Sequence, residues 1–168
     1  PEEDALAPAV LMSAELCAHG QFLAAARRAP GAVALEMAAD GEDEADSSGG
    51  QVASMTYGEM SSGVLRVAAY LNGLDGQCAV GELVGLLVER CFAWLVGLFG
   101  VLAAGGAYVP MDSEYPARRI VYIVEDAECG VLVTLRAVRA GVPGAFGGRV
   151  VVVEDVVDKC VARRAESL

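Results

Sequence analysis

Lysine and histidine are scarce in this sequence. Lys159 is the one lysine among 12 basic residues, so chemistry that needs a lysine has a single candidate, near the C-terminal end. The one histidine, His19, falls in an Ala-rich segment that predicts a helix, and no GxSxG pattern supplies a serine nucleophile. We therefore interpret His19 as a helix-surface residue, and the sequence does not indicate a nucleophile activated by histidine.

Paired cysteines are absent as well. The five cysteines are scattered, without the CxxC spacing of a zinc site or a disulfide framework; they are Cys17, Cys78, Cys91, Cys129 and Cys160. A reducing, cytoplasmic setting is the simpler interpretation. Cys17 and His19 lie two residues apart and could share a metal ion, but no second ligand pair accompanies them, so a structural role is favoured.

The sequence also lacks a phosphate-binding loop. Such a loop needs glycines that let backbone N–H groups close around the anion, together with a lysine or a helix N-terminus. Gly105-Gly106 follows a predicted helix and enters a predicted strand, the reverse of the required order, and residues 141–148 precede a strand and contain no lysine. Neither segment matches GxxxxGK[ST] or GxGxxG, and both are interpreted as turns. A small Rossmann-like nucleotide binder is disfavoured on the same ground.

Positive charge is in deficit, with 12 basic residues against 23 acidic ones and a net charge of −11. An acidic surface repels phosphate backbones, so no nucleic-acid partner is expected. Five of the acids fall in segment 40–50, among serines and glycines. This segment lacks the ligand order of a calcium loop and predicts a solvated acidic loop.

Charge is missing altogether from Cys91 to Pro110, a stretch of twenty residues that is nominally long enough to span a membrane. Several glycines and Pro110 interrupt it, and its helical part is expected to end near Ala104. About fourteen residues is the length of a buried core helix. The interpretation is a helix inside a folded domain, with no membrane partner.

What the sequence does contain is the pattern of one folded domain. Its 168 residues suit a single domain, and 55% of them are hydrophobic. Residues 1–13 have no clear pattern and are interpreted as a linker or an arm. Because the first residue is Pro1 rather than Met, we expect a piece of a longer or processed product. The early elements expected are a helix at 14–28, a hairpin over 32–57 with a long tip, and a helix at 58–72 that Gly73 stops.

From residue 83 the pattern becomes regular, with apolar strands alternating with helices. Strands are expected at 83–88, 107–111, 130–134 and 149–155, and helices at 92–104, 116–126 and 156–166, with a short one in 135–140. This alternation predicts an α/β fold, with a mostly parallel, Rossmann-like sheet, helices on both faces and right-handed crossovers.

A few polar and aromatic residues in this half could carry chemistry. Asp112 and Glu114 follow a strand and could form a carboxylate pair, but their position in a turn before a helix favours a capping role. Phe92, Trp94 and Phe99 have helical spacing and are interpreted as core. From these residues alone, the sequence predicts a fold class and no reaction.

Three segments, taken together, resemble the adenylate-forming enzymes. Residues 55–74 resemble the block LTYxEL…A..LA..L near the start of these enzymes. Residues 82–112 resemble the next block, which usually ends in LKAGGAYVPLD and here ends in LAAGGAYVPMD. Residues 115–134 are similar to YPxeRlxyml.Dsg..lvlT. The resemblance covers about residues 15–155.

The stretch AGGAYVPMD, followed by Tyr115-Pro116, matches the amino-acid adenylation domains of nonribosomal peptide synthetases more closely than acyl-CoA synthetases or luciferases. The resemblance implies that residues 14–168 are the incomplete N-terminal lobe of the adenylate-forming fold. It further implies a parent enzyme that uses ATP and magnesium to convert an amino acid to its aminoacyl-adenylate. That parent would pass the acyl group to a phosphopantetheine carrier protein.

The same resemblance places the parent's phosphate loop shortly after residue 155 and its amino-acid pocket, ribose-binding aspartate and catalytic lysine later still. It assigns no catalytic, cofactor-binding or metal-binding role to any residue of this chain, and Lys159 has no matching context. We expect the isolated piece to be inactive and to bind no cofactor tightly. The alternatives are a non-enzymatic remnant that binds a partner through an exposed sheet edge, and a fragment of an acyl-CoA synthetase-like enzyme.

Overall fold

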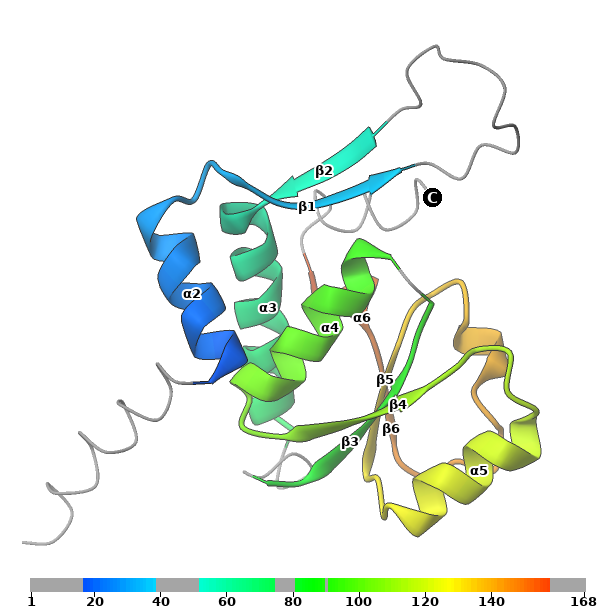
Figure 1. Ribbon diagram of the computed structural model, residues 1–168. Helices are drawn as coiled ribbons and strands as arrows, with labels where there is room; N and C mark the ends of the chain where they lie inside the picture. The colour runs from blue at the N-terminus through cyan, green and yellow to red at the C-terminus, as the bar shows by residue number, and fades with distance from the viewer. Residues whose placement is uncertain (1–16, 39–51, 75–80, 90, 158–168) are drawn as a thin grey trace, which may run out of the picture.

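A computed structural model describes residues 17–38, 52–74, 81–89 and 91–157 (Figure 1). Several expectations lie outside the described residues: the arm at 1–13, the acidic loop at 40–50, nearly all of the terminal helix at 156–166, and the positions of Cys78, Lys159 and Cys160. Among the described residues, no helix combines the length and the apolar character that crossing a membrane would require.

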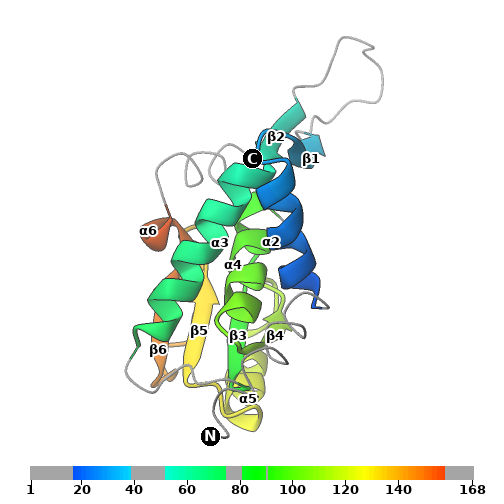
Figure 2. The same ribbon diagram turned by 90° about the vertical axis from the view of Figure 1, so that its left-hand side faces the viewer.

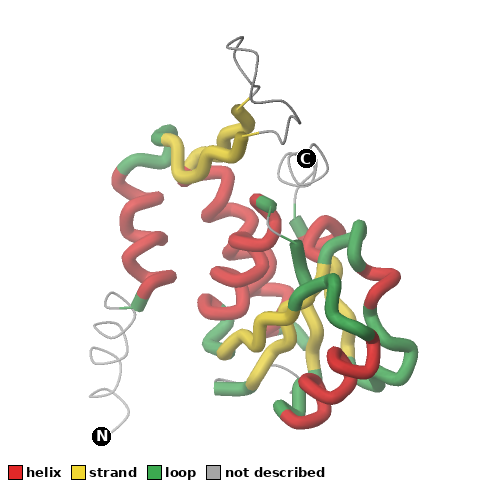
Figure 3. The backbone as a smooth tube through the Cα atoms, turned by 45° about the vertical axis from the view of Figure 1, so that its right-hand side comes forward, coloured by secondary structure: helices red, strands yellow, loops and turns green. Residues whose placement is uncertain are grey.

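The N-terminal part is a helix, a hairpin and a second helix. Helix α2 (Ala18–Arg28) leads into β1 (Val33–Ala38), which pairs antiparallel with β2 (Val52–Thr56), and α3 (Tyr57–Asn72) follows at once. The expected hairpin and both helices are confirmed. Figure 3 shows this hairpin lying apart from the main sheet, across the ends of α2 and α3.

A reciprocal cap fixes the point where β2 ends and α3 begins. The Glu59 N–H donates to the Thr56 hydroxyl (3.2 Å), and the Thr56 N–H donates to the Glu59 carboxylate (2.8 Å). This capping box satisfies two N–H groups that the first turn of a helix leaves unpaired. The segment resembling LTYxEL therefore has a structural role at Thr56 and Glu59.

The main sheet has four strands, all parallel. They are β3 (Leu83–Leu87), β4 (Ala107–Met111), β5 (Val131–Thr134) and β6 (Arg149–Val152), in the order β4-β3-β5-β6. The predicted α/β fold with a parallel sheet is confirmed. Central β3 and β5 are the most deeply buried strands, as expected of continuous apolar runs covered on both faces.

Helices cover both faces of this sheet. Helix α4 (Phe92–Ala103) packs with α3 over one face, and α5 (Ala117–Asp126) packs on the other (Figure 2). The connection from β3 to β4 moves one way across the sheet and the connection from β4 to β5 moves the other way. Because α4 and α5 lie on opposite faces, the two crossovers have the same hand, as the rule of right-handed crossovers requires.

Glycine brings α3 and α4 into close contact. A Cβ placed on Gly100 of α4 would lie 2.5 Å from Cγ1 of Val67 on α3. Val96, Gly97 and Val101, in the middle of α4, are all buried, and Gly97 lies against the main sheet rather than against α3. The uncharged stretch from Cys91 is thus a core helix, as expected.

The main differences from the predicted element boundaries lie at the end of β6, at the start of α5 and in the segment after β5. The fourth strand ends at Val152, and α6 (Val153–Val156) occupies residues expected to continue it. The valine run fits either element; in the structure the Glu154 carboxylate contacts the end of β5, and Val153 is buried in the core. Pro116 is the N-cap of α5 rather than its first residue, and the short helix expected in 135–140 is a 3₁₀ turn at Arg139–Gly141.

Candidate functional site

The four parallel strands end along one edge of the sheet, where parallel sheets commonly bind ligands. Glu89 follows β3, Asp112 follows β4, Arg136 follows β5 and Glu154 follows β6. None of these positions is close in sequence to the next, and the parallel topology alone brings them to the same edge. This edge is therefore the candidate site.

A cleft of about 590 Å³ opens beside the ends of β3 and β4. Its wall combines apolar side chains, two aromatic rings and three carboxylates; the lining residues are Leu86, Val88, Glu89, Trp94, Pro110, Met111, Asp112, Ser113, Glu114 and Tyr115. Trp94, expected in the core, is instead only partly buried and faces this cleft. Trp94 is not fully buried because α4 covers the middle of the sheet and leaves the β4 side of the sheet open.

Hydrogen bonds organise the acidic side of the cleft. The Ser113 hydroxyl donates to Oε1 of Glu89 (3.2 Å), and the Glu114 N–H donates to Oδ1 of Asp112 (2.9 Å). Asp112 therefore caps its own turn. The expectation that it caps the following helix is wrong, because the N-cap of α5 is Pro116 and no side chain caps this helix.

The cleft has the wrong charge for a nucleotide phosphate. Glu89, Asp112 and Glu114 contribute carboxylates, and no lysine or arginine is among the described lining residues. Carboxylates repel a phosphate group, whose binding requires N–H donors or cations. Among the described residues, no group of three or more His, Cys, Asp or Glu side chains is arranged to hold a metal ion.

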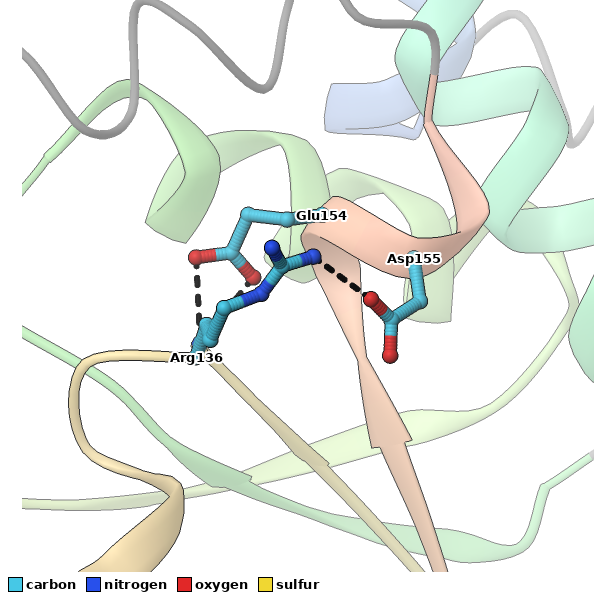
Figure 4. A network of polar contacts seen from close by, with 3 residues as sticks. All are labelled: Arg136, Glu154 and Asp155. Carbon is cyan, nitrogen blue, oxygen red and sulfur yellow. Dashed lines mark hydrogen bonds and ion pairs between the residues drawn. The ribbon is translucent and has the colours of Figure 1, made fainter.

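The ends of β5 and β6 are joined by a polar network (Figure 4). The backbone N–H of Arg136 donates to both carboxylate oxygens of Glu154 (3.0 and 3.1 Å), and the Arg136 guanidinium pairs with Asp155 (2.6 Å). Glu154 is buried, with 8% of the residue exposed, whereas the side chains of the Arg136–Asp155 pair are largely exposed. Nearby, the buried Thr134 hydroxyl donates to the Leu87 carbonyl (2.8 Å), tying β5 to β3. These contacts set the direction in which the chain leaves β6.

Cys91, at the start of α4, is not a nucleophile at neutral pH. Burial raises the pKa of its thiol, and the charges of Glu154 and Glu89 raise it further. The backbone N–H groups of Trp94 and Ala93 oppose this shift without cancelling it. Because the thiolate is the reactive form, the protonated Cys91 is inert. Burial likewise raises the pKa of Cys129.

The remaining candidates within the described residues fall into structural positions, whereas Lys159 lies outside those residues. Cys17 is the N-cap of α2 and His19 lies in its first turn; residues two apart on a helix do not face each other, so they do not form a ligand pair. Gly105 follows the C-cap of α4 with a φ of 91°, and Gly106 passes close to the Glu82 carbonyl. The glycines of 141–148 form the turn before β6.

Comparison with known proteins identifies the family. The sequence pattern described as AMP-binding enzyme matches residues 22–167. The chain belongs to this family. Among curated relatives it is 47% identical over 81 residues to gramicidin S synthase 2 of Brevibacillus brevis, covering 48% of this chain and 2% of the relative. It is 32% identical over 136 residues to polyketide synthase PksN of Bacillus subtilis (strain 168), covering 80% and 2%.

A solved structure agrees with the sequence comparisons. A crystal structure of the nonribosomal peptide synthetase FmoA3 matches with a TM-score of 0.70 and 27% identity, over 84% of this chain and 14% of that chain. The resemblance to the N-terminal part of a peptide-synthetase adenylation domain is confirmed, and so is the fold. The chain spans between 2% and 4% of the length of the first curated relatives that it matches, so it corresponds to a small part of such a protein.

Proposed function

We propose that this member of the AMP-binding enzyme family is the N-terminal part of an ATP-dependent ligase that activates an amino acid as its aminoacyl-adenylate. The acyl group would then pass to a phosphopantetheine carrier in nonribosomal peptide synthesis. The observation that carries the proposal is the family match over residues 22–167, together with relatives that are peptide synthetases. The matched blocks build the sheet and its covering helices, so this part supplies a scaffold.

The described residues do not fit ATP or magnesium by themselves. The cleft at the ends of β3 and β4 is lined by carboxylates without a described basic side chain, and no metal-binding group is formed within the described residues. The guanidinium of Arg136 is already paired with Asp155. We therefore derive no chemical step here, and propose that later segments of the parent hold both groups.

Amino-acid-dependent pyrophosphate exchange tests the proposal. Purified residues 1–168 should give no exchange above a control without enzyme, because nothing described here offsets the charge of a transferring phosphoryl group. The full-length parent should exchange pyrophosphate with at least one amino acid. Exchange by the isolated chain would refute its inactivity, and a full-length parent that activates fatty acids but no amino acid would favour the acyl-CoA synthetase alternative.

A non-enzymatic interaction module is the second candidate. It is favoured by the two edge strands of the sheet, β4 and β6, whose outer sides have no pairing partner among the described residues. An unpaired edge strand is a template for another strand. A full-length gene product that ends at the described region, and that binds a partner without exchanging pyrophosphate, would support this second candidate.

A further inference from the structure

The cleft at the ends of β3 and β4 has a wall rich in rings and hydrocarbon. Trp94, which is partly buried, and Tyr115, which is exposed, both line it, and Val88, Pro110 and Met111 add apolar surface. Its volume of about 590 Å³ lies within the range of pockets that bind small molecules. The wall therefore suits a small ligand with an apolar body.

Three carboxylates line the same cleft, and no described cation pairs with them. Glu89 accepts a hydrogen bond from Ser113 through Oε1, and Asp112 accepts one from the Glu114 N–H through Oδ1. Among the described residues, the second oxygen of each of these two carboxylates has no partner, and Glu114 has no ion pair. Carboxylates that are not paired attract a positively charged ligand.

The carboxylates are distributed along the cleft and do not form a metal site. Glu89 follows β3, whereas Asp112 and Glu114 follow the neighbouring strand β4. No group of three or more His, Cys, Asp or Glu side chains among the described residues is arranged to hold a metal ion, so the three carboxylates do not converge on one point. Several positive charges spread along one molecule complement this arrangement better than a single ion does.

We propose that this cleft binds a linear polyamine, an alkyl chain that carries several ammonium groups. The ammonium groups donate hydrogen bonds to Glu89, Asp112 and Glu114, and the alkyl segments between them pack on Trp94 and Tyr115. An ammonium group over the face of either ring is attracted further by the π electrons of that ring. Binding requires neither ATP nor the chemistry of the proposed ligase.

The fluorescence of Trp94 reports binding directly, because Trp94 is the one tryptophan of the chain. Titration of the whole chain with spermidine should change this fluorescence saturably, and calorimetry should give the same Kd. Triethylene glycol, an uncharged chain, and magnesium chloride, a cation without an apolar body, should leave the fluorescence unchanged. A chain that shows no saturable binding of spermidine by either method, or that responds equally to magnesium, would overturn the proposal.

Two variants with the same change in charge locate the ligand. Glu89→Gln keeps the acceptor for Ser113 and removes a charge from the cleft, so it should weaken spermidine binding about fivefold. Glu36→Gln removes the same charge at an exposed position of β1 outside the cleft, and should weaken binding less than about twofold. Equal weakening by the two variants would mean a general attraction to an acidic chain and would refute the site.

A second pair of variants tests the contact with the rings. Tyr115→Leu leaves Trp94 as the probe and should weaken spermidine binding about threefold. Tyr122→Leu changes an exposed tyrosine of α5 that does not line the cleft, and should leave the Kd unchanged. Equal Kd values for the two variants would contradict packing on the ring. A triarginine peptide that binds through the same residues more tightly than spermidine would assign the cleft to a basic protein segment and overturn the polyamine proposal.

Discussion

Glu128 and Gly105 occupy the same backbone position, the first residue after the C-cap, at the ends of α5 and α4 respectively. Their φ angles are 49° and 91°, and each follows the C-cap of its helix. At α5 the Cys129 N–H donates to the Val124 carbonyl (2.9 Å) and the Glu128 N–H to the Glu125 carbonyl (3.1 Å). The end of α4 has the same two bonds, which define a Schellman motif. Glycine suits this left-handed position, and a residue with a Cβ is strained there.

Replacing Glu128 by glycine should therefore stabilise the fold. We expect Glu128→Gly to raise the free energy of unfolding by about 0.5–1 kcal/mol, because relief of the left-handed strain exceeds the entropy that glycine adds to the unfolded chain. Gly105→Ala is the reciprocal variant and should lower it by about 1 kcal/mol. Urea denaturation of the three proteins measures both changes. A less stable Glu128→Gly protein would show that the glutamate side chain contributes more than its strain removes.

Gly100 should tolerate no side chain while Val67 faces it. A Cβ at position 100 would lie 2.5 Å from Cγ1 and 2.6 Å from Cβ of Val67, so α3 and α4 must move apart. We expect Gly100→Ala to destabilise the protein by about 1–3 kcal/mol despite the higher helix propensity of alanine. Gly144→Ala, where a Cβ meets nothing within 4 Å, is the control.

A double variant separates this overlap from other effects of the substitution. Val67→Ala removes the opposing methyl groups, so Gly100→Ala combined with Val67→Ala should lose less stability than the two single changes added together. Thermal unfolding monitored by circular dichroism gives the three values. Strict additivity would mean that the two residues do not oppose each other in the folded protein.

The raised pKa of the Cys91 thiol links stability to alkaline pH. The unfolded chain ionises this thiol at its ordinary pKa, whereas the folded chain keeps it protonated to higher pH. The contribution of Cys91 is fully present below the ordinary thiol pKa and is lost as pH rises through the folded value. The stability difference between wild type and Cys91→Ala should therefore shrink between about pH 7 and about pH 10. A difference that is constant over this range would contradict the assignment.

Salt should promote self-association of the isolated chain. Its net charge of −11 keeps copies apart at low ionic strength, and screening weakens that repulsion as salt rises. Partly buried apolar residues of α4, including Trp94 and Leu98, add to the surface available for association. Sedimentation velocity at low and moderate salt should show larger species in the second condition. A chain that is monomeric in both, with one sharp unfolding transition, would behave as a self-sufficient domain.

The sequence by itself determined the elements of the main sheet and their class. The apolar runs of β3 and β5 do not alternate with polar residues, a pattern typical of strands that are covered on both faces. The alternation of strands and helices along the chain predicted a parallel sheet. The cap at Thr56 and Glu59 and the glycine at the end of α4 also depend only on residues that are close in sequence. The sequence alone therefore specifies these two features. The family followed from the stretch AGGAYVPMD because that stretch is long and specific.

Only the tertiary structure decided which distant residues share a surface. Arg136 and Glu154 meet because β5 and β6 are neighbours in the sheet, and β6 ends at Val152, before the valine run ends. Trp94 faces a cleft because α4 leaves the β4 side of the sheet uncovered, which no helical periodicity could indicate. These are relations between elements, and a linear pattern specifies each element without its neighbours.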